Sequence, residues 1–327
     1  MVDAGSAAGL SGKVVTLLGG SGFLGRHLAQ KLLARGARLR VASRHPEQAY
    51  ALKPLGNLGQ VQFVRCDVTD GDRLAAVLAG SDMVVNLVGA FAGDLDAVQG
   101  TGAGRIAAAA RAAGASAFVH VSALGADAES PVAYARTKAE GEEAVLAAFP
   151  GATVLRPSIL FGPDDTFVNR FAGLIALLPV LPVFAPDAPL QPVLVDDAAE
   201  AVARALAEPG RFGGQTFEIA GPETITMGAI NRRIAAAQAR APLFLDLPDA
   251  VSSAFATLTG WLPGAPITRS QWALLRAGNA ASGQLPDLSA FGIIPRPLGL
   301  FLDRWMERFR KHGRFGDADG ARGARQS

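Results

Sequence analysis

The sequence predicts an α/β fold in which a doubly wound parallel sheet is joined to a smaller C-terminal lobe. Short charge-free strand segments alternate with segments of helical periodicity, and the first strand segment ends in a glycine-rich turn. Half of the 327 residues are apolar, which is enough to bury a sizeable core. Because parallel neighbours need crossover connections, the helices of such a fold cover both faces of the sheet.

The first strand and helix are the clearest elements. Residues 14–18, VVTLL, form a charge-free, β-branched run that is typical of a parallel strand buried on both faces. A helix from Phe23 to Ala34 follows, because leucines recur along one of its faces and Gly36 provides a stop signal. The unit is therefore a strand, a glycine turn and a helix.

The same alternation continues through the first half of the chain. We expect further strands at residues 39–43, 61–64, 83–88, 117–122 and 153–156, and helices at residues 72–79, 97–113 and 131–148. Together with the first strand and helix, these elements define a core domain over residues 13–162.

Beyond the core domain, prolines interrupt an apolar region. A helix at residues 196–207 and a strand at residues 216–220 then resume the earlier pattern, so we expect residues 191–221 to return to the sheet. Residues 163–190 and 222–297 remain for the smaller lobe. We expect this lobe over the carboxyl ends of the strands, where open α/β sheets bind their ligands.

Residues 298–312 predict an amphipathic helix with basic residues beside an apolar stripe. The stripe consists of Leu298, Phe301, Leu302, Trp305, Met306 and Phe309. Such a helix suits a membrane surface or the groove of a partner protein, and the same periodicity fits a helix packed on its own domain. We expect residues 1–12 to form a flexible N-terminus and residues 313–327 a disordered tail.

Composition and charge argue against several classes of protein. The net charge of +2 and the lack of a basic stripe with interleaved aromatics argue against nucleic-acid binding. The single cysteine, Cys66, excludes an internal disulfide and a cysteine-based zinc site; we expect a buried apolar role for it and no metal. The N-terminus does not read as a signal peptide, and prolines interrupt the uncharged stretches 171–186 and 250–268. We therefore expect no transmembrane helix and a cytoplasmic protein.

Gly19, Gly22 and Gly25 follow the first strand and open the first helix. A backbone that turns tightly, approaches a pyrophosphate closely and packs a helix on a strand needs small residues at these places. Glycines also serve as ordinary turn residues, but the order of strand, turn and helix favours a dinucleotide-binding Rossmann loop. The loop residues expected at the ligand are Gly19, Ser21, Gly22, Phe23, Leu24 and Gly25.

The adenosine end of the dinucleotide is expected about twenty residues further on, where the second strand ends in Ser43 and Arg44. A guanidinium forks two hydrogen bonds onto a phosphate, so Arg44 favours NADP(H) over NAD(H), unless it is only a solvated surface residue. Asp67 and Val68 close the third strand, where the carboxylate either accepts from the adenine amine or serves as a turn residue.

Tyr134 and Lys138 lie four residues apart on a predicted helix and therefore share one face. Ser122 ends the preceding strand. In this arrangement the ammonium lowers the pKa of the phenol, Tyr134 exchanges a proton with an oxygen, and Ser122 orients a carbonyl during hydride transfer. The order of strand, serine and helix favours a role in cofactor binding and leaves catalysis open.

These motifs together resemble the extended, atypical short-chain dehydrogenase/reductase family over residues 13–225. The shared motifs are GGSGFLG, CDVTD, NLVG, VHVSA, YARTK and RPSILFGP. The resemblance implies that the dinucleotide also contacts Leu87, Val88, Gly89, Val121, Ser122, Pro157 and Ser158, with Pro157 and Ser158 beside the nicotinamide. Many members carry an asparagine on the helix before the fifth strand, whereas the helix predicted here has none, which weakens the case for proton relay through it.

A narrower resemblance is to the nucleotide-binding, thirty-nine-kilodalton-type accessory subunits of respiratory complex I and their bacterial relatives. It is carried by LKPLGNLGQVQ, SALGAD, AFPGATVLRPSILFGPDD and QPVLVDDAAEAV. It implies a tightly held NADPH that need not turn over, complex I subunits near the quinone region as partners, and peripheral attachment to the cytoplasmic side of the bacterial inner membrane through residues 298–312. The alternatives are an active NAD(P)H-dependent reductase or sugar epimerase/dehydratase-like enzyme, for example in ubiquinone biosynthesis, and a free sensor of the NADPH/NADP ratio.

Overall fold

The computed structural model describes residues 9–259, 268–311 and 313. Its internal contacts divide the chain into two compact units: unit 1 comprises Met1–Ser158, Val195–Ala220 and Ala281–Pro295, and unit 2 comprises Ile159–Leu194, Gly221–Ala280 and Arg296–Ser327. Residues 9–12, which we expected to be flexible, form a turn in which Leu10 is fully buried. The rest of the predicted N-terminus and residues 314–327 of the predicted tail lie outside the described residues.

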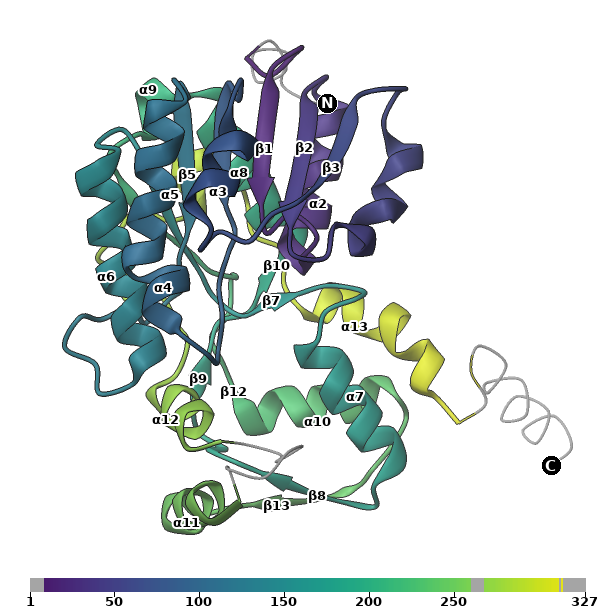
Figure 1. Cartoon of the computed structure of the whole chain (residues 1–327). Coiled ribbons are helices and arrows are strands. Elements are labelled where there is room, and N and C mark those ends of the chain that lie inside the picture. Colours follow the sequence, from purple (N-terminus) through teal and green to yellow (C-terminus); the bar gives the residue numbers. More distant parts are fainter. Residues whose placement is uncertain (1–8, 260–267, 312, 314–327) are drawn as a thin grey trace, which may run out of the picture. The chain divides into compact units, whose positions relative to one another are not determined.

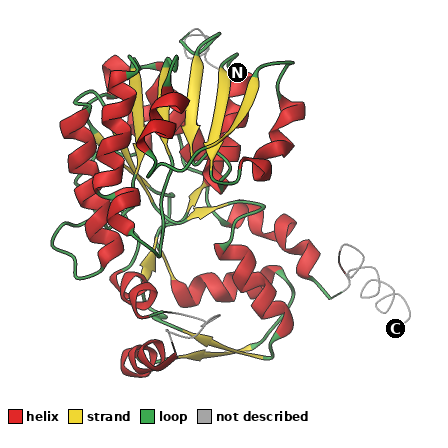
Figure 2. Cartoon of the chain, viewed as in Figure 1, coloured by secondary structure: helices red, strands yellow, loops and turns green. Residues whose placement is uncertain are grey.

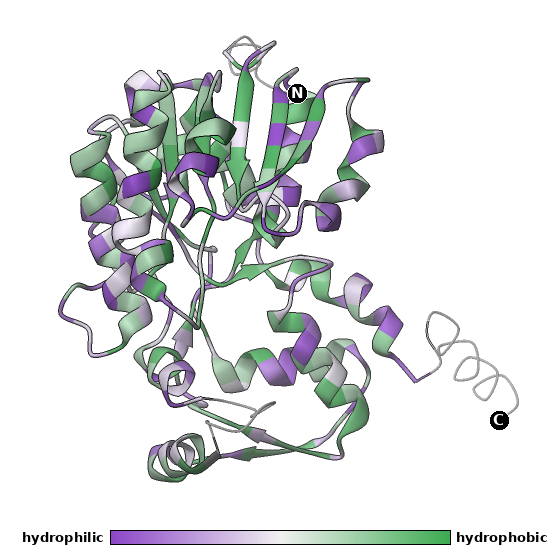
Figure 3. Ribbon diagram, viewed as in Figure 1, coloured by the Kyte–Doolittle hydropathy of each residue, from purple (hydrophilic) through white to green (hydrophobic). Residues whose placement is uncertain are grey.

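A seven-stranded parallel sheet forms the centre of unit 1 (Figure 1), with the order β11-β6-β5-β4-β1-β2-β3. The strands are β1 (Val14–Leu18), β2 (Arg38–Ser43), β3 (Val61–Arg65), β4 (Met83–Asn86), β5 (Ala117–Val121), β6 (Thr153–Pro157) and β11 (Thr216–Ile219). Figure 3 shows β1 in hydrophobic green over most of its length. Its apolar residues suit a strand that is covered on both faces, and four of its five residues are buried. The chain order reverses between β1 and β4, and open sheets of this type bind ligands at such a point.

Helices flank this sheet on both faces (Figure 2). The helical segments are η1 (Pro46–Leu55), α2 (Phe23–Ala34), α3 (Gly71–Leu78), α4 (Leu95–Gln99), α5 (Thr101–Ala112), α6 (Ala133–Ala148), α8 (Val195–Ala207), α9 (Pro209–Phe212) and η2 (Leu288–Phe291). Helices α2 and α8 pack together over one face, whereas α3, α5 and α6 cover the other around an apolar cluster. Cys66 is buried in that cluster as a free thiol. The predicted doubly wound fold is confirmed, and α8 and β11 belong to unit 1.

The helix that we predicted over residues 97–113 is interrupted at Gly100. The carboxylate of Asp96 accepts hydrogen bonds from the backbone N–H and the hydroxyl of Thr101, at 2.9 and 2.8 Å. Gly100 itself leaves the helical conformation, with φ of −85° and ψ of −110°. The break ends α4 at Gln99 and leaves that side chain fully buried.

Residues 281–295, which we expected in the smaller lobe, belong to unit 1. The backbone N–H of Glu218 on β11 donates to the carbonyl of Pro286 at 2.9 Å, and the Glu218 carboxylate accepts from Ser282. Phe291 is buried and stacks on Phe212, with ring centroids 4.4 Å apart. An irregular segment has no periodicity, so the sequence pattern did not indicate which domain it joins.

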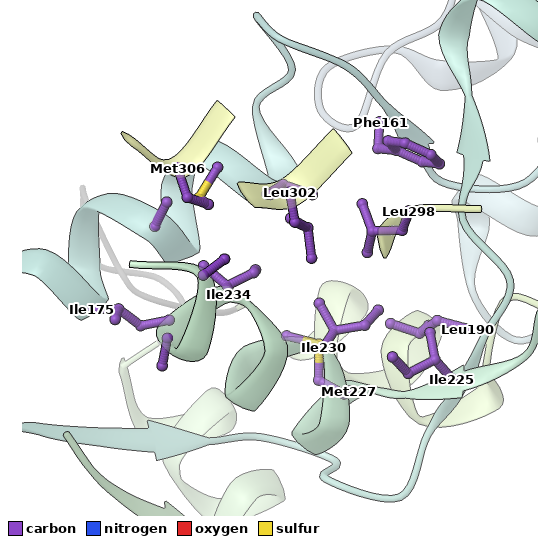
Figure 4. Close-up of a cluster of buried hydrophobic side chains, with 14 of the residues drawn as sticks. Phe161, Ile175, Leu190, Ile225, Met227, Ile230, Ile234, Leu298, Leu302 and Met306 are labelled. Atoms are coloured by element: carbon purple, nitrogen blue, oxygen red, sulfur yellow. The ribbon is translucent and has the colours of Figure 1, made fainter. Parts of the chain in front are cut away.

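Unit 2 is built from short paired strands and helices around its own apolar core (Figure 4). Its elements are β7 (Leu160–Phe161), α7 (Phe167–Leu177), β8 (Val180–Val183), β9 (Pro189–Leu190), β10 (Val193–Leu194), β12 (Ile225–Thr226), α10 (Met227–Ala237), β13 (Leu243–Asp246), α11 (Asp249–Thr259), α12 (Arg269–Ala277), α13 (Gly299–Met306) and η3 (Glu307–Phe309). The strands pair as β7 with β10, β9 with β12, and β8 with β13.

The C-terminal amphipathic helix is shorter than predicted and uses its apolar stripe inside unit 2. Helix α13 ends at Met306, η3 continues to Phe309, and residue 312 lies outside the described residues. Leu298, Leu302 and Met306 are buried in the core, where Figure 4 shows them beside side chains of α10. Of the three interpretations of the sequence, packing on its own domain is therefore the one that the structure shows for this stripe. Among the described residues, no helix combines the length and apolar character needed to cross a bilayer.

Candidate functional site

The turn after β1 brings its glycines against neighbouring backbone. Gly19 has a φ of +78°, and a Cβ on it would lie 3.2 Å from the carbonyl carbon of Leu87. A Cβ on Gly25 would lie only 2.6 Å from the carbonyl oxygen of Gly20. A side chain therefore fits at neither position without displacement, so glycine allows the turn to approach the end of β4 and α2 to pack on it.

Helix α2 begins at this turn with unsatisfied backbone N–H groups. Its N-cap is Gly22, which has no side chain to accept from them, and the first turn of the helix contains no acidic residue. Ser21 and Leu24 are buried, while Phe23 packs edge-on against His27. A helix of 12 residues carries partial positive charge at this end, which suits the pyrophosphate of a dinucleotide.

The carboxyl ends of β2 and β3 carry the residues predicted for the adenosine end. Arg44 is exposed directly after β2, and the buried Ser43 hydroxyl has no hydrogen-bond partner in the described part of the chain. Asp67 accepts from the backbone N–H and the hydroxyl of Thr69, at 3.0 and 2.8 Å, so its role as a turn residue is confirmed. These bonds, with a smaller contribution from the charge of Arg44, lower the pKa of the Asp67 carboxyl. Val68 is buried in the apolar cluster behind it.

A buried amide holds the segment after β4, where Leu87, Val88 and Gly89 were predicted to contact the dinucleotide. Asn86 accepts from the backbone N–H of Val88 at 3.0 Å, and its amide nitrogen lies 3.1 Å from Nδ1 of His120. The first bond orients the amide so that it donates to His120, which places the imidazole proton on Nε2. His120 is fully buried, and burial, with a smaller contribution from the charge of Lys138, lowers its pKa to about 3.

Gln99 holds the next residue of the same loop. Its Oε1 accepts from the backbone N–H of Ala90 at 3.0 Å, and its Nε2 donates to the hydroxyl of Thr137 on α6 at 3.0 Å. Gln99 lies in the helix predicted over residues 97–113, which contains no asparagine. We predicted no site role for Asn86, Gln99 or His120, although each is a polar side chain in an otherwise apolar segment and Asn86 and His120 lie within the motifs NLVG and VHVSA.

Tyr134 and Lys138 lie on the same face of α6, four residues apart. The Lys138 ammonium donates to the carbonyl of Val121 at 3.3 Å, and a Cβ on Gly89 would lie 3.4 Å from it. Burial lowers the pKa of Lys138 to about 8, against a smaller raising effect of Glu142. The pKa of Tyr134 is raised to about 12, because burial penalises the charged phenolate, so the lowering that we expected from the Lys138 ammonium is wrong. The buried Ser122 hydroxyl has no partner among the described residues, so it has hydrogen-bonding capacity for a ligand.

Pro157 and Ser158 lie at the end of β6. The carbonyl of Pro157 accepts from Leu124 at 3.0 Å, and the backbone N–H of Ser158 donates to Ile219 at 2.9 Å. These bonds fix both residues at the carboxyl edge of the sheet. Their placement beside a nicotinamide stays a prediction.

Known proteins resemble this chain at two levels. A family described as NAD(P)H-binding matches residues 19–167, which include the glycine turn, Ser122, Tyr134 and Lys138. The mitochondrial NADH dehydrogenase (ubiquinone) 1 alpha subcomplex subunit 9 of Rattus norvegicus is 32% identical over 317 residues, which are 94% of this chain and 82% of the relative. The chain belongs to this subunit 9 family.

The same subunit of Arabidopsis thaliana is 34% identical over 260 residues, which are 77% of this chain and 64% of the relative, so part of the plant protein has no counterpart in the alignment. Among solved structures, the NADPH-dependent quinone oxidoreductase QOR2 of Escherichia coli, complexed with NADPH, aligns with a TM-score of 0.68. It covers 89% of this chain and 99% of its own at 19% identity, which shows a shared fold.

The residues of unit 1 fit a nicotinamide dinucleotide, the class of cofactor that the matched NAD(P)H-binding family takes. Gly19 lets the turn pack closely against the backbone after β4, α2 offers uncapped N–H groups to a pyrophosphate, and Ser122 offers a buried hydroxyl. Because the rat match covers nearly the whole chain, both units have counterparts in the subunit 9 family.

Proposed function

We propose that this chain is an NADP(H)-binding accessory or assembly subunit of respiratory complex I, NADH:ubiquinone oxidoreductase, in which the dinucleotide is chiefly structural. The observation that carries the proposal is the match to a named subunit of NADH dehydrogenase over 94% of the chain. A protein that shared only the dinucleotide-binding domain would match in unit 1 alone. The alignment extends through unit 2, which supports a shared assembly role.

The dinucleotide is assigned to unit 1 from the glycine turn to the start of α6. The turn residues Gly19 to Gly25 hold the pyrophosphate, Arg44 and Ser43 hold the 2′-phosphate, and Asp67 with Val68 borders the adenine. The nicotinamide half lies along the segment 87–89, Val121, Ser122 and Pro157–Ser158. Tyr134 and Lys138 bind the nicotinamide ribose. Exposed Arg44 has its guanidinium available for a phosphate, which supports NADP(H) over NAD(H).

Attachment at the cytoplasmic side of the bacterial inner membrane, near the quinone region of complex I, belongs to the same proposal. The apolar stripe of α13 is packed within unit 2, so it is not available for lipid. The exposed basic side chains Arg304 and Lys311 are the part of this segment that remains for contact with a charged partner or headgroup.

An active reductase is the second candidate, and the unpartnered Ser122 hydroxyl favours it. Ser122, Tyr134 and Lys138 have the types and the order needed to orient a carbonyl, supply a proton and bind the ribose. When bound, the nicotinamide would supply or accept the hydride. Burial raises the pKa of Tyr134 to about 12, so the phenol is protonated at neutral pH and can donate a hydrogen bond to a carbonyl oxygen.

Purification from native membranes tests the proposal. We expect a tagged chain, solubilised in detergent, to copurify with complex I and to release NADPH only on denaturation. Tyr134→Phe should assemble normally, because the subunit needs no proton transfer. Absence of the chain from complex I would refute the subunit proposal, and turnover that Tyr134→Phe abolishes would establish the reductase.

A further inference from the structure

Phe91 stacks on Tyr134 at the edge of the dinucleotide site. The two ring centroids lie 4.6 Å apart and the ring planes differ by 10°. Phe91 is 72% exposed, so burial in a core does not explain its position. Within the described residues, Phe91 provides the aromatic ring that stacks on Tyr134.

The loop that carries Phe91 is fastened immediately before it. Ala90 donates its backbone N–H to Gln99, which in turn donates to Thr137, three residues after Tyr134 on α6. Val88 is held in the same way by Asn86. Both amide side chains are fully buried. Because buried amides of this kind are costly to leave unpaired, they fix the loop against α6 and set Phe91 over the Tyr134 ring.

We propose that Phe91 is a positioning residue of the dinucleotide site: its ring fixes the Tyr134 side chain and shields the hydroxyl from bulk water, so that a bound dinucleotide leaves slowly. The part on dinucleotide release rests on the proposed function, in which Tyr134 binds the nicotinamide ribose. The part on shielding rests on the ring geometry alone. The raised pKa of Tyr134 agrees with a phenol held away from water.

The tyrosine content makes the shielding measurable. The chain has two tyrosines, so Tyr50→Phe leaves Tyr134 as the single phenol that titrates. In this background Phe91→Ala should lower the pKa of Tyr134 towards its ordinary value, read from the absorbance of tyrosinate. Leu58→Ala is the matched control, because Leu58 is an exposed apolar residue of unit 1 that lies outside the site. It should leave the titration unchanged.

The second measurement is the rate at which the full chain releases bound NADPH after dilution into excess unlabelled nucleotide. Loss of an aromatic stack predicts release roughly three- to tenfold faster from Phe91→Ala than from wild type. Phe91→Leu should be intermediate, since it keeps apolar bulk without the ring. Leu58→Ala should release NADPH as wild type does.

The outcomes are separable. An unchanged titration in Phe91→Ala overturns the shielding, and an unchanged release rate overturns the link to retention. If the wild type holds no dinucleotide, the proposed function and the retention step both fail, while the titration still decides whether Phe91 shields Tyr134.

Discussion

Arg156 on β6 donates a two-pronged hydrogen bond to Glu142 on α6. Its Nε lies 2.9 and 3.0 Å from the two carboxylate oxygens, and its Nη2 lies 2.6 Å from Oε2. The Glu142 side chain is buried, and Glu142 follows Lys138 by one turn of the same helix. The pair therefore ties α6 to the sheet directly beside the residue proposed to bind the nicotinamide ribose.

Glu142→Gln should destabilise the protein strongly. The substitution removes a bidentate ion pair between two planar groups. It leaves the charged, partly desolvated guanidinium of Arg156 without its carboxylate partner. We expect the free energy of unfolding to fall by about 2–4 kcal/mol, measured by urea denaturation.

Glu143→Gln is the matched control, because it makes the same change at the next, exposed residue of α6. It should alter the free energy of unfolding by less than about 0.5 kcal/mol. Equal effects of the two substitutions would show that the ion pair contributes nothing beyond the helix charge.

Gly19→Ala should abolish dinucleotide binding, and backbone strain alone does not account for the expected loss. Gly19 and Gly114 have nearly the same φ, +78° and +80°, so alanine strains both, by about 1–2 kcal/mol. A Cβ on Gly19 meets the backbone of Leu87, whereas a Cβ on Gly114 has nothing within 4 Å.

Gly114→Ala therefore serves as the control for strain. Gly114→Ala should lose only the stability that backbone strain costs, whereas Gly19→Ala should lose more stability and should also lose NADPH binding in equilibrium titrations. Binding retained by Gly19→Ala would contradict the role of the close approach.

Much of unit 1 could be predicted from the sequence, because each element carries its own local signal. The run VVTLL shows that β1 is buried on both faces, and the leucine spacing of α2 shows which side it buries. The parallel order then follows from the crossovers. Tyr134 and Lys138 were found because helical spacing fixes their common face.

The remaining features depend on tertiary contacts that no local pattern encodes. Residues 281–295 join unit 1 through Phe291, and the apolar stripe of α13 reads the same whether it meets lipid, a partner or its own core. Asn86 and Gln99 hold the loop before Phe91 and are themselves bonded to His120 and Thr137, 34 and 38 residues away, so their roles appear only in the folded chain.

Arg44→Asp should reverse the preference for dinucleotide. The substitution removes a guanidinium that suits the 2′-phosphate and leaves two carboxylates there, since the Asp67 carboxyl has a lowered pKa and stays ionised. We expect NADPH affinity to fall by roughly a hundredfold while NADH affinity is kept or improved, measured by calorimetry.

Arg38→Asp provides the comparison, because it changes the charge equally at the opposite end of β2. It should leave the ratio of the two affinities unchanged. The same shift in both variants would assign the effect to overall charge and not to the site.

Because of Lys138, the free energy of unfolding of the dinucleotide-free protein should vary with pH in the alkaline range. The ordinary pKa of 10.5 is lowered to about 8 in the folded state by burial. Between these values the unfolded chain binds a proton that the folded chain has lost, so the free energy of unfolding rises as the pH increases. Tyr134 acts in the opposite sense only above pH 10, because its raised pKa makes the folded chain retain a proton that the unfolded chain loses.

The measurement is urea denaturation of wild type and Lys138→Met from pH 7.5 to about 9.5, below the range in which Tyr134 contributes. The wild type should gain on the order of 1–2 kcal/mol relative to the variant over this interval. Lys31→Met controls for the loss of a lysine outside the site, on α2, and should follow the wild type. Saturating NADPH should reduce the rise, because ribose hydroxyls that accept from the ammonium raise its pKa in the folded state. Parallel curves for wild type and Lys138→Met would show that Lys138 titrates as a solvated lysine and would remove the physical basis for its role at the ribose.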